Sequence, residues 1–246
     1  MVKLCYAALI TFLCLLPAIG DDTAEIIIKK VEDNQSFTTQ KYSAVMIIIK
    51  GERKLVKKFY GFSKDEGGKS FMTFTNPEDS GVKYLKIIDE LWIYFPDADD
   101  IMKISGHLLK QGLMGSDISY EDMMESEKYK TQYDPVFSGD EVFRDRKCSR
   151  ITLSAISPQA RYEKQIMLID TQYNVPLKIE LYAKGGRLIR IIEEENIKKI
   201  QDKYIAHKIT IRDLRKKDSI THIEFEDIQI NEPLDDSVFT KGNLKK

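Results

Sequence analysis

Few side chains in this sequence belong to the types that usually carry out catalysis or bind metals. The histidines are His107, His207 and His222, and none is spaced with another histidine, a cysteine or a carboxylate in a metal-ligand pattern. Nucleophile-elbow, P-loop and dinucleotide-binding glycine motifs do not occur in the sequence either. We therefore expect a protein that is not an enzyme and that uses no metal or cofactor.

One cysteine and one cluster of aspartates could suggest a nucleophile and a cation site, but both are better explained by a structural role. Cys148 lies in DRKCSRITLS, a strand-like stretch with no histidine nearby, so we expect a buried structural thiol rather than a nucleophile. Asp97, Asp99 and Asp100 lie in PDADD, which lacks the twelve-residue calcium-loop pattern and its terminal glutamate. The composition of PDADD predicts a β-turn instead.

The segment GHLLKQGLMGSD combines glycines with large apolar residues. Gly106, Gly112 and Gly115 allow bends and movement, and the side chains between them need an apolar partner. A lid that packs on a ligand when it is closed would have this composition, and so would a buried loop. The apolar residues of the segment are Leu108, Leu109, Leu113 and Met114.

Most of the chain alternates between apolar and polar residues, which predicts β-strands. In Pro176–Tyr182, Leu177, Ile179 and Leu181 share one face and polar side chains share the other. Gly185-Gly186 between two such runs is typical of a hairpin turn. Many short strands with local turns favour an antiparallel meander. A strand is also expected at Tyr129–Tyr133.

Helices are expected in few places. DTAEIIIKKVE, Asp22 to Glu32, has an apolar stripe of Ile26, Ile27 and Val31. Some turns fall between Ser105 and Ser126, and a helix is weighed at Glu193–Gln201. So little helix leaves a long one-sided sheet to cover its apolar face by itself or with a ligand. The pattern allows a barrel with a cavity or a sandwich with a filled core.

The N-terminus predicts export, and the charge balance excludes one class of partner. Lys3, the apolar run Leu4–Leu16, Pro17 and the small residues Ala18 and Gly20 follow the pattern of a signal peptide cleaved before Asp21. An uncleaved anchor is the alternative, although the run is shorter than the ~20 residues of a bilayer span. Lys and Arg number 38 against 39 Asp and Glu, so we expect no nucleic-acid partner.

One stretch, LWIYFPDADDIMKISGHLLKQGLMGSDISYEDM, resembles the signature of a known bacterial family, the periplasmic outer membrane lipoprotein-sorting proteins. The similarity covers about Ala24 to Leu244, and Ile101-Met102-Lys103 departs from it where relatives often carry arginines. The signature is a tryptophan strand ending in tyrosine and proline, followed by G-S-D-x-S-Y-x-D. Its residues are Trp92, Tyr94, Pro96, Gly115, Ser116, Asp117, Ser119, Tyr120 and Asp122.

The resemblance implies a mostly β fold like that of the LolA and LolB lipoprotein carriers. This fold is an incomplete, strongly curved antiparallel β-barrel, with helices plugging its concave face. We expect residues 1–20 to be the signal peptide and residues 21–246 to form one such domain. The expected site is a hydrophobic cavity and lid made of Trp92, Tyr94, Leu108, Leu109, Leu113, Met114, Ile223 and Phe225.

The implied function is a monomeric periplasmic carrier that binds lipid or lipoprotein acyl chains for transport towards the outer membrane. Relatives with this fold also serve as partners of efflux-type membrane transporters, so an inner-membrane transporter is an expected partner. The alternative is a non-enzymatic adaptor of a transporter or envelope assembly, with a filled core. An enzyme acting on envelope lipids would need clustered polar residues in the cavity, and His107 and Asp122 would be its best candidates.

Overall fold

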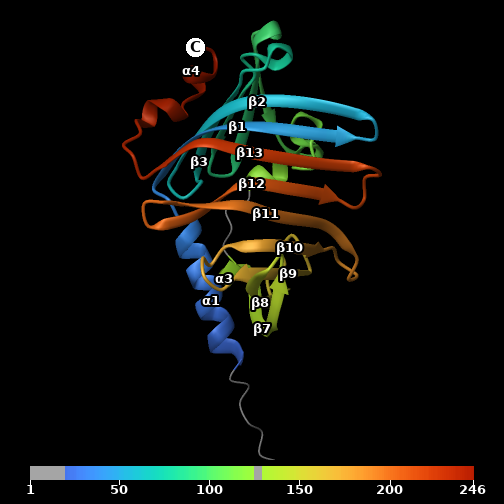
Figure 1. Cartoon of the computed structure of the whole chain (residues 1–246). Coiled ribbons are helices and arrows are strands. Elements are labelled where there is room, and N and C mark those ends of the chain that lie inside the picture. The colour runs from blue at the N-terminus through green and yellow to red at the C-terminus, as the bar shows by residue number, and fades with distance from the viewer. Residues whose placement is uncertain (1–19, 125–128) are drawn as a thin grey trace, which may run out of the picture.

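The strands of this protein form one antiparallel sheet (Figure 1). The computed structural model describes residues 20–124 and 129–246. The sheet has 13 strands in the order β6-β5-β4-β3-β2-β1-β13-β12-β11-β10-β9-β8-β7. The strands are β1 (Thr39–Lys50), β2 (Arg53–Lys64), β3 (Lys69–Phe74), β4 (Lys83–Ile87), β5 (Glu90–Phe95), β6 (Asp100–Ile104), β7 (Tyr133–Phe143), β8 (Arg146–Ala155), β9 (Lys164–Asp170), β10 (Pro176–Tyr182), β11 (Leu188–Ile200), β12 (Lys203–Asp213) and β13 (Ser219–Ile230).

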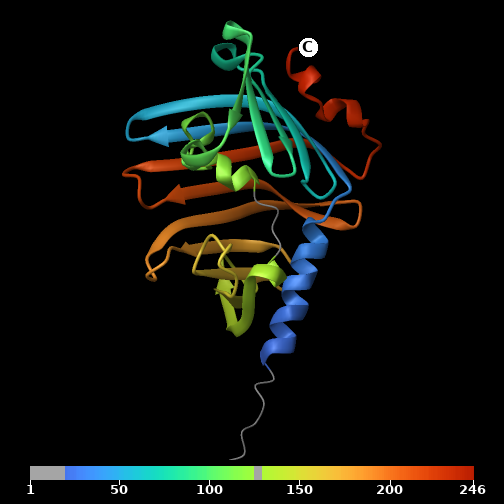
Figure 2. The ribbon, with the colours of Figure 1, turned by 180° about the vertical axis from the view of Figure 1, so that it is seen from behind.

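The sheet curls strongly but does not close, because β6 and β7 remain as its two edges in the part of the chain that is described. Figure 2 shows the concave side, where a long helix and a group of short helical turns lie against the sheet. The predicted fold, an open curved barrel with helices on its concave face, is confirmed. The helices are α1 (Gly20–Gln35), α2 (Tyr120–Met124), α3 (Tyr129–Gln132) and α4 (Lys241–Leu244), with 3₁₀ turns η1 (Pro77–Asp79), η2 (Pro96–Ala98), η3 (Gly106–Lys110), η4 (Leu113–Gly115) and η5 (Asp236–Phe239).

The long helix α1 covers one half of the concave face. Its buried stripe is Ala24, Ile28 and Val31, which follow the i, i+4, i+7 spacing of one helix face. Of the predicted stripe, Val31 is buried and Ile27 packs against the same cluster, but Ile26 was wrong, because it lies on the solvent side and is 55% exposed. In a run of three isoleucines, periodicity alone does not select which one faces the sheet. The buried stripe packs on strands β7 to β11.

The segment from η3 to α2, residues 106–124, covers the other half. Here the buried apolar side chains come mainly from β1 to β5. We call these residues the cover segment. The glycine positions fit its tight course: a Cβ added to Gly112 would lie 2.2 Å from the carbonyl oxygen of Ser116. Gly115 has φ +80° and Gly106 has φ +57°, conformations that favour glycine.

Two secondary-structure predictions were wrong. The helix weighed at Glu193–Gln201 is part of β11, which pairs along its length with β12. Cross-strand ion pairs such as Glu195 with Lys208 explain why a run rich in helix-forming residues is a strand here. The strand expected at Tyr129–Tyr133 is the single helical turn α3, and β7 begins at Tyr133.

The C-terminal segment packs on the outer face of the sheet. Phe239 and Leu244 bury Phe71, Leu85 and Trp92 there. Cys148 is also fully buried, as the sequence predicted. The predicted signal peptide lies outside the described residues, apart from Gly20 at the start of α1. Among the described residues, we find no helix with the length and hydrophobicity needed to cross a membrane.

Candidate functional site

Three pockets lie in a row on the concave face over β11 and β12, between α1 and the cover segment, and we call this row the trough. Its floor is a series of directly paired residues on the two strands: Glu194 with Ile209, Ile192 with Ile211, and Arg190 with Asp213. Alternate residues of a strand point to the same face and are about 7 Å apart, so these pairs are successive steps along one line. The first pair therefore joins the acidic Glu194 to an isoleucine, the second pair is apolar, and the third consists of two opposite charges.

The first of three pockets along the trough lies at the C-terminal end of α1. This helix-end pocket has a volume of about 250 Å³. The ring of Tyr42 lies over Gly61 on the neighbouring strand, where an added Cβ would come within 2.6 Å of the ring. Burial raises the pKa of Tyr42 to about 12, so its hydroxyl stays neutral. The other lining residues are Asn34, Gln35, Phe37, Gln40, Val175, Pro176, Glu194, Tyr204, Ile205, Ala206, Ile209, Phe225 and Ile228.

The second pocket lies at the middle of the trough. This apolar pocket has a volume of about 130 Å³ and has Ile192 and Ile211 on its floor. Its wall carries three tyrosines, and Asp122 and Arg190 line its far end. The remaining lining residues are Ile118, Tyr129, Gln132, Tyr133, Tyr162, Gln165, Ile179 and Leu181.

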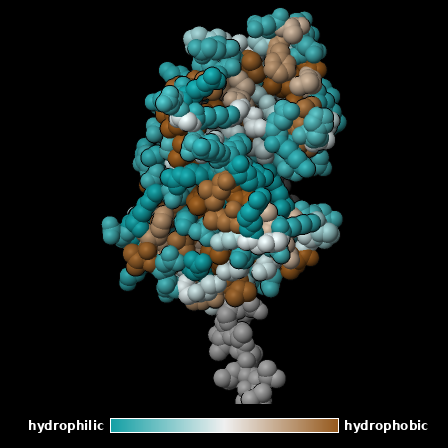
Figure 3. Space-filling model, turned by 90° about the vertical axis from the view of Figure 1, so that its right-hand side faces the viewer, coloured by the Kyte–Doolittle hydropathy of each residue, from teal (hydrophilic) through white to brown (hydrophobic). Residues whose placement is uncertain are grey.

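The third pocket is the largest, about 580 Å³, and lies at the end of the trough beside the β10–β11 and β12–β13 turns. Figure 3 views the molecule from the side on which these turns lie, and shows hydrophobic surface enclosed by hydrophilic residues. We call it the basic pocket, because its lining includes six basic and three acidic side chains. These are Lys110, Arg161, Lys184, Arg190, Arg215 and Lys216, and Asp117, Glu121 and Asp213.

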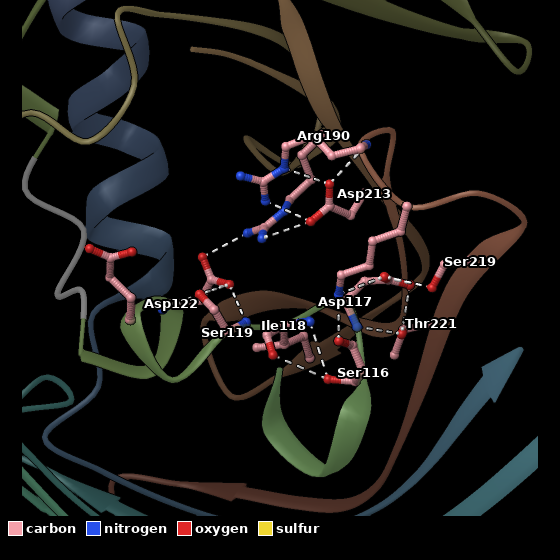
Figure 4. Close-up of polar contacts among 12 residues, drawn as sticks. Ser116, Asp117, Ile118, Ser119, Asp122, Arg190, Asp213, Ser219 and Thr221 are labelled. Carbon is pink, nitrogen blue, oxygen red and sulfur yellow. Dashed lines mark hydrogen bonds and ion pairs between the residues drawn. The ribbon is translucent and has the colours of Figure 1, made fainter. Parts of the chain in front are cut away.

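A buried ion cluster lies where the apolar pocket and the basic pocket meet. Figure 4 shows its polar contacts. Asp122 accepts a hydrogen bond from Arg190 Nη1 at 2.7 Å and also pairs with Arg161. The Arg190 side chain is only 4% exposed. Burial favours the neutral acid, but the charges of Arg190 and Arg161 outweigh burial and hold the pKa of Asp122 below its ordinary value. Asp122 therefore stays ionised and fixes α2 to β11.

Asp213 continues this cluster on the neighbouring strand. Its carboxylate accepts two hydrogen bonds from the Arg215 guanidinium, at 2.8 and 2.6 Å, and Arg190 Nη2 lies 3.9 Å away. Burial acts to raise the pKa of Asp213, but the bonds from Arg215 prevail and lower it. Arg190 Nε is buried and has no hydrogen-bond partner among the described residues.

A second polar cluster fixes the cover segment to β13 (Figure 4). The Asp117 carboxylate accepts hydrogen bonds from Ser219 Oγ at 2.7 Å and from Thr221 Oγ1 at 3.0 Å. Its backbone N–H donates to Thr221 Oγ1 at 2.9 Å. Lys216 Nζ donates to the Ser116 carbonyl at 2.9 Å and lies 3.2 Å from Asp117. The polar residues of the G-S-D-x-S-Y-x-D signature thus attach the cover segment to the sheet.

The residues expected to line a cavity fall on two faces of the sheet. Six of the eight belong to one apolar cluster on the concave face: Leu108, Leu109, Leu113, Met114, Ile223 and Phe225. Of these, Phe225 lines the helix-end pocket. Trp92 and Tyr94 lie on the outer face with the C-terminal segment. The structure therefore brings the cover segment and the last strand together and places the tryptophan strand's aromatic residues elsewhere.

No sequence motif marks Arg190, Arg161 or Asp213, which the fold brings to the site. One signal was available for Arg190. It is paired with Leu181, and Leu181 belongs to an alternating run whose apolar face was identified from the sequence. A charged residue at a position facing the concave side indicates a buried ion pair or a ligand contact. No group of residues in the described ranges is arranged to hold a metal ion.

Comparison with solved structures defines the class of this fold. A DUF1329 family protein from Desulfovibrio piger ATCC 29098 aligns with a TM-score of 0.82, at 22% identity, over 92% of this chain and 99% of that chain. A domain assigned by its description to outer membrane lipoprotein sorting, from Vibrio parahaemolyticus, aligns with a TM-score of 0.78, at 22% identity, over 92% and 98%. A LolA superfamily protein from Nitrosomonas europaea gives 0.71, at 20% identity, over 92% and 100%. The chain therefore has the LolA-like fold.

The family follows from the sequence comparison. A family model described as "-like: Uncharacterized protein" matches residues 66–246, and the chain belongs to that family. A search of curated proteins finds no match.

Proposed function

We propose that this protein is a periplasmic carrier that shelters acyl chains of a lipid or lipoprotein in the concave trough. The observation that carries the proposal is the apolar floor of the trough, Ile192, Ile211 and Ile209, between two covering elements. The fold supports it, because structures described as lipoprotein-sorting and LolA superfamily proteins share this architecture. A carrier of this kind performs no chemistry on its cargo.

The energetic demand on such a carrier is simple. Each methylene of an acyl chain exposed to water costs about 0.8 kcal/mol, and burial on isoleucine and aromatic side chains offsets this cost. The helix-end and apolar pockets are about 250 and 130 Å³. Ligand-binding pockets usually measure about 300–1,000 Å³, so a whole acyl chain requires the coverings to move apart.

The cover segment is the element we expect to move. It consists of short 3₁₀ and α turns, and its polar attachments to the sheet are concentrated at Asp117 and Asp122. When it lifts, its own buried residue Leu113 becomes available to cargo together with the concave face of β13. We infer that acyl chains contact Leu108, Leu109, Leu113, Met114, Ile223 and Phe225 in that open state.

The setting follows from the same proposal. The N-terminal sequence pattern supports export to the periplasm, and a carrier there needs a donor and an acceptor. We infer an inner-membrane transporter as the donor and the outer membrane as the destination. Two edge strands, β6 and β7, offer backbone hydrogen bonds to such a partner.

A binding assay with a pocket-filling variant tests the proposal. Ile209 is partly exposed and lines the helix-end pocket, so Ile209→Trp should fill the pocket and weaken binding of a fluorescent fatty acid by roughly tenfold. Ile88→Trp is the matched control, because Ile88 is 66% exposed and outside the trough. Mass spectrometry of organic extracts should also recover lipid from the purified protein. Absence of lipid and of probe binding would exclude a carrier.

A further inference from the structure

The trough is asymmetric, and the asymmetry indicates which cargo it fits. Its floor carries the acidic Glu194 beside Ile209 in the helix-end pocket and is apolar at Ile192 and Ile211. It ends with Arg190 and Asp213 at the basic pocket. Tyr162 and Arg190 line both the apolar pocket and the basic pocket, so these two pockets adjoin. An apolar pocket that adjoins a basic pocket fits a molecule with a hydrocarbon chain and a negatively charged end.

The basic pocket has charge that the protein does not neutralise. Its three carboxylates are already engaged: Asp117 with Lys216, Glu121 with Arg161, and Asp213 with Arg215. Lys110 and Lys184 have no carboxylate within 4.0 Å in the residues that the structure describes. Both are exposed, so they stay hydrated and able to bind an anion at the mouth of the pocket.

Arg190 adds a second, independent observation at the inner end of the pocket. Its side chain is almost completely buried, and its Nε donor has no acceptor within the described parts of the chain. A buried donor without a partner costs about 1–3 kcal/mol, so such a group usually has a functional explanation. After a small shift of the guanidinium, an anionic oxygen entering from the basic pocket would satisfy it.

We propose that the cargo is an anionic amphiphile, whose carboxylate or phosphate lies in the basic pocket between Lys110, Lys184 and Arg190 while its chain occupies the apolar pocket. This inference rests on the proposed carrier function and narrows it to a substrate class. Neutral lipids of the same chain length lack the contacts at the basic end. The charged end also fixes the direction in which the chain enters.

The test compares two probes that differ only in charge. A pyrene-labelled fatty acid and the alcohol with the same chain and label are titrated into the full-length protein at pH 8 and low salt. We expect the acid to bind roughly tenfold more tightly than the alcohol, and the difference to shrink at about 1 M salt, where the Debye length is ~3 Å.

Charge-reversal variants locate the effect. In Lys110→Glu/Lys184→Glu, affinity for the acid should fall roughly tenfold while affinity for the alcohol is unchanged. The control is Lys54→Glu/Lys58→Glu, which changes the net charge equally at exposed positions on β2, outside all three pockets. Arg190→Gln should reduce the same preference, with its folding checked by circular dichroism.

The outcomes separate this inference from the carrier function. If the alcohol binds and the acid has no advantage, the anionic class is wrong and the carrier stands. If neither probe binds, the carrier itself fails. Inorganic phosphate alone is titrated by calorimetry. If phosphate bound as tightly as the fatty acid, the basic pocket would be a site for a soluble anion, and the proposal would be overturned. An equal loss in the β2 control would overturn the assignment to the basic pocket.

Discussion

The two coverings of the concave face are held by different forces. The helix α1 contacts the sheet mainly through Ala24, Ile28 and Val31, all fully buried and apolar. Its polar contacts include the uncharged Asn34, whose side chain exchanges two hydrogen bonds of 2.8 Å with the backbone of Tyr204. The cover segment buries Ser116, Asp117 and Ser119 as well as Leu113 and Tyr120. Apolar burial is non-directional and insensitive to pH, whereas buried carboxylates depend on geometry and on charge. A fold can thus combine a permanently attached covering with one that is able to release.

The largest expected effect comes from removing the main ionic attachment of the cover segment. Asp122→Ala would leave the buried Arg190 and the adjacent Arg161 without this carboxylate. Breaking a buried ion pair from one side costs about 3–5 kcal/mol, so the free energy of unfolding in urea should fall by that order.

The neighbouring carboxylate supplies the control for this loss. Glu121 is 42% exposed and lies 3.4 Å from Arg161, so Glu121→Ala should cost less than about 1 kcal/mol. Equal losses for the two variants would mean that the cover segment is held by general electrostatics and not by the buried cluster.

The next largest effect tests the apolar attachment of α1. Ile28 is fully buried in the cluster beneath the helix, so Ile28→Ala should cost about 2–4 kcal/mol through lost burial and the cavity left behind. Ile26→Ala deletes the same atoms at a 55% exposed position and should change stability by about 0.5 kcal/mol or less. If Ile26→Ala proved the more damaging of the two, the buried face of α1 would be assigned incorrectly.

The same contrast explains what could be predicted from the sequence. Strand alternation and turn residues were enough to predict an antiparallel sheet. The alternation in each strand shows which of its two faces is apolar and must be covered. The helix α1 was also predicted, although the stripe was placed on Ile26 and not on Ile28. Local patterns of this kind predict which side chains are buried, and buried apolar side chains are the main attachment of α1 to the sheet.

The pockets and the ion cluster required the structure. Arg161, Arg190 and Asp213 are far apart in the chain and meet only because the sheet curls and α2 lies across it. The aromatic residues Trp92 and Tyr94 were selected from the sequence as cavity residues, but the fold places them on the opposite face of the sheet. Alternation places them on one face of β5, but it does not tell which face becomes concave.

The smallest expected effect is a dependence on pH that affects the cover segment before it affects α1. The folded-state pKa values of Asp122 and Asp213 are lowered, so their contribution to stability is complete above the unfolded pKa of about 4. That contribution is lost as the pH falls through the folded-state values. Hydrogen-exchange protection factors, corrected for intrinsic rates, should therefore fall on acidification for residues 113–124 before they fall for residues 24–35.

Asp122→Asn sharpens this measurement, because the amide cannot titrate. At pH 7 the variant should already show weaker protection of residues 113–124 than the wild type, and its protection should change less on acidification. The two proteins should converge at low pH, where the wild-type carboxylate is protonated. Loss of protection in α1 at the same pH as in the cover segment would show that the two coverings release together. The contrast between an apolar and an ionic attachment would then have no consequence for the opening of the trough.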